Sequence, residues 1–174
     1  MKLRGSVKIN GKQYKKGDHI PWYFIYPFFL FHMAGFGGSG FVMAYINDGP
    51  PLSFLYMHGG IAIVVYTAFY LAFFGVDEVK WMFINAGLGA LAIYTQIGWL
   101  VGLFGKNVDD YPIERHVIPF LYFVLYTFLL RRAFMDIFGI KASEGEENTG
   151  MNKVDYIYII GSILFYGLTY IFGR

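Results

Sequence analysis

The sequence contains no cysteine among its 174 residues. Disulfide bonds, thiolate zinc sites, iron–sulfur clusters and thiol nucleophiles are therefore excluded from this chain. Charge is also scarce: 15% of the residues are charged and the formal net charge is +2, too small to indicate nucleic acid as a partner. We expect no cleaved secretory signal, because the first apolar run follows a polar stretch of about 20 residues and lacks a small-residue cleavage site.

Ionisable side chains are missing from the central part of every long apolar run, with the exception of His32. Proton- or ion-coupled carriers need such groups at membrane depth, so the sequence argues against a pump or a proton-driven transporter. A nucleophile–base–acid set for hydrolysis is not visible either. The segment 35–40, GFGGSG, lies inside an apolar run, which favours a helix-packing role over a phosphate-binding loop.

Apolar and aromatic residues are present in excess. They make up 56% and 21% of the chain, whereas a soluble domain has about 45–50% apolar residues with glycine included. Because the excess lies in long runs, lipid is the expected solvent. We predict an all-α integral membrane protein, a bundle of five transmembrane helices over residues 22–46, 52–74, 79–104, 116–138 and 156–172. The last run is near the lower length limit for a crossing.

The first 20 residues differ from the membrane domain of residues 21–174, because they are polar and rich in lysine. Asn10 and Gly11 are the favoured pair for a two-residue hairpin turn, since both tolerate positive φ. We therefore predict a short β-hairpin over residues 7–14. Its lysines are also suited to anionic lipid headgroups, at about 1 kcal/mol for each nearby charge.

The distribution of basic residues predicts the orientation of the spans. With five crossings, Lys106, Arg115 and Arg174 fall on one side, and the other eleven of the 14 Lys and Arg residues fall on the opposite side. We expect the more basic side, with the N-terminus, to be cytoplasmic and the C-terminus to lie outside the inner membrane. If the last run only lies on the surface, the C-terminus is cytoplasmic.

Small residues recur inside the predicted spans, where they allow helices to approach closely. The candidate packing positions are Gly35, Gly38, Gly40, Gly59, Gly60, Gly98 and Gly102. Contacts between spans of one chain explain them most simply. An oligomer interface is the functional alternative.

His32 and His58 are the candidate cofactor ligands. A four-helix membrane cytochrome holds haem b between two histidines on facing helices, and these two lie on successive predicted spans. His32 is about 15 Å from one membrane face, and His58 is about 10 Å from the other, at 1.5 Å per helical residue. A haem needs its two ligands nearly level, so the pair suits it only marginally. The structural alternative for His32 is a hydrogen bond to a backbone carbonyl or a tyrosine hydroxyl of a neighbouring helix.

Two further groups have a possible chemical role. His58, His116, Met43 and Met57 lie toward one face and have the ligand types that copper prefers, although methionine also fills gaps between helices. At the other face, Arg131 and Arg132 are expected to reach lipid phosphates, with Asp136 one turn away as a partner for one of them.

These patterns favour a non-catalytic structural or accessory subunit of a membrane assembly, formed with other membrane subunits or by self-association within the lipid bilayer. The first alternative is a haem- or metal-binding subunit of an electron-transfer chain. The second is a small-molecule channel or lipid-binding protein. It is supported only by the polar residues of the third span, which are Asn85, Tyr94, Thr95 and Gln96.

Overall fold

The computed structural model describes residues 3–9, 11–46 and 49–138, together with Ile160, Gly161 and Leu164. Residues 1–138 form one compact unit and residues 139–174 a second one. The predicted fifth span, residues 156–172, falls in the second unit. Apart from the three residues named above, which are helical, this span lies outside the described residues.

Three helices of the first unit are long and apolar enough to cross a membrane: α1 (Trp22–Tyr45), α2 (Leu52–Phe74) and α5 (Ile113–Ile137). Each begins directly after a proline, whose fixed φ suits a helix start. The predicted spans 22–46, 52–74 and 116–138 agree with these helices to within three residues. The mostly helical architecture is thereby confirmed, and by length and hydropathy these three helices are candidate membrane spans.

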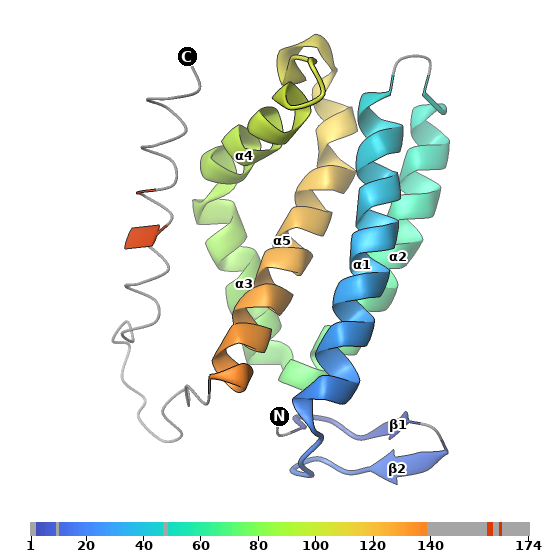
Figure 1. The fold of residues 1–174 in the computed structure, drawn as a ribbon. Helices are drawn as coiled ribbons and strands as arrows, with labels where there is room; N and C mark the ends of the chain where they lie inside the picture. Colours follow the sequence, from blue (N-terminus) through green and yellow to red (C-terminus); the bar gives the residue numbers. More distant parts are fainter. Residues whose placement is uncertain (1–2, 10, 47–48, 139–159, 162–163, 165–174) are drawn as a thin grey trace. The chain divides into compact units, whose positions relative to one another are not determined.

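Helix α5 is the centre of this unit. It packs against α1 along much of its length and also contacts α2, α3 (Val76–Leu88) and α4 (Ala90–Gly102), so that it lies between the two helix pairs (Figure 1). Its side chains Leu125 and Leu129 are at most 1% exposed. The core of the bundle therefore runs along the inner faces of α1, α2 and α5.

The prediction of one continuous third span, residues 79–104, is wrong. The structure has two helices there, α3 and α4, which meet at Gly89 with an angle of 74°. Glycine weakens a helix because it loses more backbone freedom than other residues, and Gly87 and Gly89 stand together at this point. The helix restarts at once, since the N–H of Ile93 donates to the carbonyl of Gly89.

The predicted loop at residues 75–78 is also shorter than expected, because α3 begins immediately after Gly75. This glycine has a φ of +91°, a conformation that side chains rarely adopt, and it reverses the chain in a single residue. Asp77 and Glu78 consequently lie in the first turn of α3, where carboxylates complement the positive end of the helix dipole.

The bent pair α3–α4 runs from one end of the bundle to the other, as a broken span does. Near its start, Glu78 pairs with Arg132 close to the end of α5. Beyond its end, Lys106 donates to the carbonyl of Tyr45, the last residue of α1. A re-entrant loop would bring both ends of the pair to the same end of the bundle. The described residues thus contain three continuous candidate spans and one broken one.

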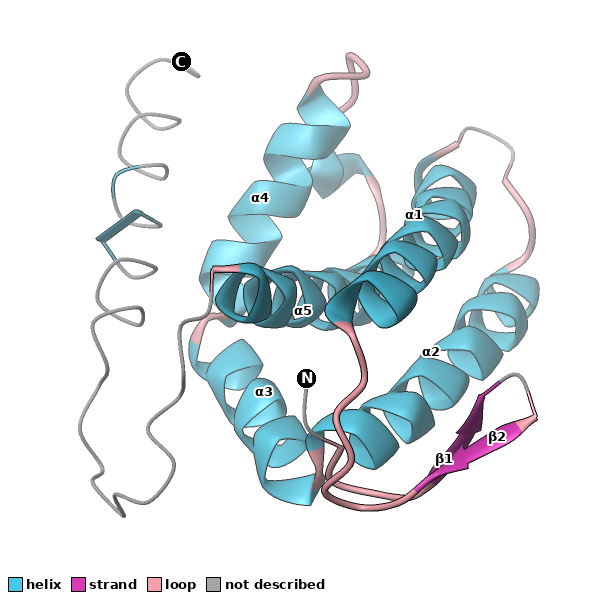
Figure 2. Ribbon diagram, turned by 60° about the horizontal axis from the view of Figure 1, so that its bottom comes forward, coloured by secondary structure: helices cyan, strands magenta, loops and turns pink. Residues whose placement is uncertain are grey.

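The predicted hairpin is confirmed. Strands β1 (Val7–Ile9) and β2 (Lys12–Tyr14) pair antiparallel with Val7 opposite Tyr14, and Gly11 has a φ of +80°. The segment ahead of the hairpin is fixed to the bundle, because the N–H of Arg4 donates to the carbonyl of Phe73 at 3.3 Å and Leu3 is only 1% exposed. Figure 2 shows the hairpin at the same end of the bundle as the α2–α3 junction.

Candidate functional site

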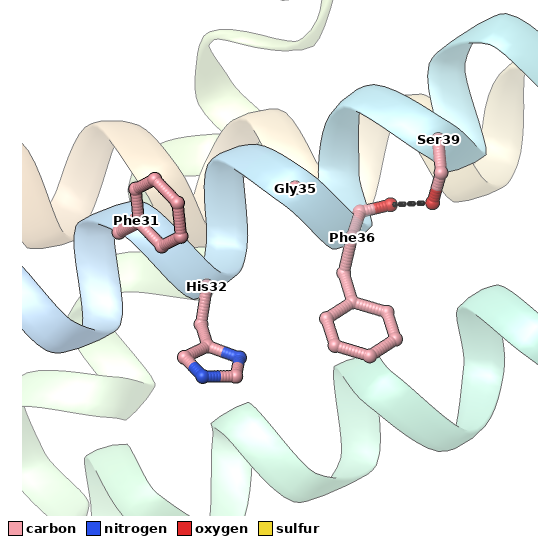
Figure 3. A pocket seen from close by; sticks show the side chains of 5 residues that line it. All are labelled: Phe31, His32, Gly35, Phe36 and Ser39. Atoms are coloured by element: carbon pink, nitrogen blue, oxygen red, sulfur yellow. Dashed lines mark hydrogen bonds between the residues drawn. The ribbon is translucent and has the colours of Figure 1, made fainter.

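An open hollow of about 300 Å³ lies on the outer face of α1, at the middle of this candidate span. Its lining comes entirely from α1: Phe31, His32, Gly35, Phe36 and Ser39 (Figure 3). The His32 side chain is exposed and lies between aromatic rings, with centroid distances of 4.4 Å to Phe28 and 6.3 Å to Phe36. Among the described residues no hydrogen-bond partner of the imidazole is seen.

The side chain of His58, on α2, lies near the other end of this hollow. Its ring is 5.8 Å from Phe36 and 6.2 Å from Phe54, and its Nε2 is 3.4 Å from the hydroxyl of Ser39. Ser39 donates its only hydroxyl proton to the carbonyl of Phe36 at 2.8 Å. The Ser39 oxygen can therefore only accept from His58, which places the imidazole proton on Nε2.

This placement does not suit a haem held by both histidines. His58 is level with Ser39, whereas His32 lies seven residues earlier on α1, which corresponds to about 10 Å along the helix axis. Two imidazoles that ligate one metal approach it to about 2 Å each, so their nitrogens would have to be far closer. Nor do the described residues contain a group of three His, Asp or Glu side chains able to hold a metal ion.

The side chains considered for copper are also placed unfavourably. His116 is buried, and both of its ring nitrogens already have partners: Nδ1 is 2.8 Å from the hydroxyl of Tyr45 and Nε2 is 3.2 Å from the carbonyl oxygen of Tyr111. Met57 is 57% exposed on α2. Met43 is half-buried, and its carbonyl oxygen accepts a hydrogen bond from Arg115.

The surroundings of His116 select one tautomer of its neutral ring. A carbonyl oxygen only accepts, so the contact with Tyr111 requires a proton on Nε2. In the neutral ring Nδ1 then has no proton and accepts from the Tyr45 hydroxyl. The ring of Tyr94, on α4, meets the imidazole edge-on at 5.4 Å. One side chain thus connects α1, α4 and α5 with the segment between α4 and α5.

Two cations from elsewhere in the chain bind the end of α1. This helix has no basic residue in its last turn, although its last carbonyl groups have no partner within the helix. Arg115 donates to the carbonyls of Met43 and Ala44 at 3.4 and 3.3 Å, and Lys106 donates to that of Tyr45. Positive charge is favourable at this end of the helix dipole. Sequence reasoning missed the contact; the absence of a basic residue from the last turn was its only signal.

At the opposite end of the bundle, Arg132 contacts Glu78 at 3.3 Å and lies 5.4 Å from the centre of the Phe74 ring. Asp136 accepts a hydrogen bond from the Tyr26 hydroxyl, where the sequence suggested an arginine as its partner. Arg131 and Arg132 are both half-buried. Their contact with lipid headgroups stays a prediction.

The candidate packing glycines fall into two groups. A side-chain carbon on Gly40, Gly59 or Gly98 would come within 4 Å of Ile118, Tyr122 or Val108, so these three lie where elements touch. The same carbon would meet no atom within 4 Å at four positions: Gly35, Gly38, Gly60 and Gly102. The first group has a packing role inside the chain. The second leaves space at the surface of the described unit.

The polar residues of the third span lie around the α3–α4 break. Thr95 donates to the carbonyl of Leu91, one turn earlier, and the Tyr94 hydroxyl donates to Asp109 at 2.9 Å. Asn85 is exposed and Gln96 is half-buried.

No family model matches this chain, and comparisons with curated proteins and with solved structures find no significant match.

Proposed function

We propose that the protein is a non-catalytic subunit of a membrane assembly and that it contacts its neighbour through the face of α1 around His32. The observation that supports this proposal is a polar, exposed imidazole in the middle of a candidate span, beside an open hollow. The membrane location is the part of the proposal with independent support. That support comes from the three continuous candidate spans and the broken one.

The exposed imidazole of His32 is energetically unfavourable in contact with lipid tails. Placing a polar group in an apolar medium without a hydrogen bond costs about 2–7 kcal/mol. His32 contacts aromatic rings only, among the described residues. A neighbouring helix that offers a carbonyl, hydroxyl or second imidazole removes this cost, whereas lipid tails do not.

The shape of the face supports the same conclusion. Gly35 and Gly38 leave the α1 backbone uncovered, which allows close approach of another helix. Phe31 projects beside them and is 82% exposed. A projecting ring next to a hollow on one face is what two helices need in order to interdigitate. The surrounding membrane is proposed to be the cytoplasmic one, with the N-terminus inside.

The absence of cysteine from the sequence provides the test. Single variants Ser39→Cys, which lines the hollow, and Val64→Cys, an exposed residue of α2, are oxidised in native membranes. We expect a cross-linked product from Ser39→Cys and none from Val64→Cys. Purification in mild detergent with mass determination then shows whether the product contains a second copy or a different chain.

A substitution that fills the hollow gives the matched control. Gly35→Leu introduces a side chain where the described unit has no atom within 4 Å, so the fold is retained while the face is blocked. Gly60→Leu makes the same change on α2, also without a neighbour within 4 Å. We expect only Gly35→Leu to abolish the cross-link. A monomer without co-purifying protein, or equal cross-linking at both cysteine positions, would refute the proposal.

A further inference from the structure

We propose that His116 is a pH-sensitive latch that holds the segment between α4 and α5, residues 103–112, against the end of α1. The latch goes beyond the proposed assembly role and does not depend on it, because it involves the end of α1 at Tyr45 and none of the residues that line the hollow. Its elements are the hydrogen bonds of one buried imidazole and the charges that surround them.

The neutral imidazole makes two contacts that need different atoms. Its Nε2 proton goes to the carbonyl of Tyr111, in the connecting segment, and its Nδ1 accepts from Tyr45, at the end of α1. Tyr111 in turn donates its hydroxyl to the carbonyl of Tyr45 at 2.7 Å, so the segment and the helix end are joined twice. The neutral ring thus offers a donor to the Tyr111 carbonyl and an acceptor to the Tyr45 hydroxyl.

Protonation removes this match. The imidazolium has a proton on both nitrogens, so two donors, Nδ1–H and the Tyr45 hydroxyl, face each other. Tyr45 must turn its proton away to accept, and the described contacts leave that proton no other acceptor. The result is a strained or broken contact between α1 and α5 at their shared end.

The charges around the ring add to this effect. Lys106, from the connecting segment, and Arg115, from α5, both bind the carbonyl groups at the end of α1. A third positive charge would sit on a side chain that is only 6% exposed, and burial away from water disfavours it. The carboxylate of Asp109 attracts it, but that carboxylate is exposed and bonded to Tyr94. The other facing side chains, those of Tyr45, Tyr94 and Tyr111, are uncharged.

Histidine is the side chain whose ordinary charge change falls between about pH 5 and pH 8. At acid pH on this side of the membrane, residues 103–112 therefore separate from the end of α1. At neutral pH they stay bound to it. Because Lys106 lies in this segment and binds the end of α1, opening the latch also exposes the last carbonyl groups of that helix.

The experiment measures the distance between two nitroxide labels in the full-length protein in lipid nanodiscs. The labels are attached at Val42→Cys, on α1, and Phe104→Cys, in the connecting segment, both of which are exposed. We expect a narrow distance distribution at about pH 8 and a broad one, shifted to longer distances, at about pH 5. A second pair, Val64→Cys and Trp81→Cys, lies away from the latch and should not change.

Two variants assign the effect to His116. His116→Gln offers a donor and an acceptor but cannot take up a proton, so its distribution should stay narrow at both pH values. Tyr45→Phe removes the hydroxyl that faces the imidazolium, so its distance distributions at the two pH values should differ less than in the unmodified protein. Tyr45→Phe decides the question if His116→Gln does not fold. A distribution that is independent of pH, equal broadening in His116→Gln, or an undiminished pH response in Tyr45→Phe would overturn the proposal.

Discussion

The Cγ2 methyl group of Ile118, on α5, lies 2.3 Å from the position that a side-chain carbon on Gly59 would occupy on α2. No real carbon pair tolerates this separation, so the two helices are as close as a glycine permits. The contact lies in the interior of the bundle, since Gly59 is buried and Ile118 is 2% exposed. A single hydrogen atom on Gly59 thus sets the spacing of α2 and α5.

We predict that Gly59→Ala destabilises the folded protein by about 1–3 kcal/mol, because the added methyl group overpacks the contact with Ile118. Gly60→Ala is the matched control, since nothing lies within 4 Å of its new side chain. Unfolding in mixed detergent and dodecyl sulfate micelles, followed by circular dichroism, measures both. Equal stability of the two variants would contradict the predicted helix spacing.

We predict that Arg115→Met destabilises the protein by about 1.5–3 kcal/mol, the usual worth of hydrogen bonds to a charged group. The guanidinium group binds the carbonyls of Met43, Ala44 and Pro50, three groups at and just after the end of α1. Lys80→Met changes the net charge equally at an exposed position of α3 and should have little effect. The same unfolding assay applies. A loss in Lys80→Met as large as that in Arg115→Met would show that net charge alone is responsible.

We predict that Asp110→Cys is labelled by a membrane-impermeant maleimide in intact cells, whereas Gln13→Cys and Phe138→Cys are labelled only after permeabilisation. All three residues are exposed in the structure. With α3 and α4 assigned to one broken span, the chain returns through α5 to the side of the hairpin. A re-entrant α3–α4 pair would instead leave Gln13 and Phe138 on opposite sides. That labelling pattern would reverse the assignment of a broken span.

The three continuous spans could be predicted because they depend on a local property. A run of more than 20 apolar residues matches the thickness of the hydrocarbon layer, whatever the rest of the chain does. The hairpin is local in the same sense, since Asn10 and Gly11 favour one turn type. The break at Gly89 was not predictable in this way, because glycines at 87 and 89 are equally compatible with close packing of a straight helix.

The candidate site shows the same division. The sequence indicated His32 as the one ionisable group deep in a span, and the structure places it beside the hollow on α1. The hydrogen-bond partners of the other polar side chains could not be predicted from the sequence. Tyr26 and Asp136 are 110 residues apart in the chain, and Tyr45 and His116 are 71 apart. Spacing along one helix suggested Arg131 or Arg132 for Asp136, because neighbours in sequence are all that a pattern contains.

The amino-acid sequence by itself determined three long helices of membrane-spanning length and hydropathy, their ends to within three residues, and the hairpin at Asn10 and Gly11. Only the tertiary structure decided which glycines hold helices together, where the third span bends, and that Lys106 and Arg115 complete the end of α1. The physical reason is that solvation and turn preference act on consecutive residues, whereas packing and hydrogen bonding act between residues that the fold alone brings together.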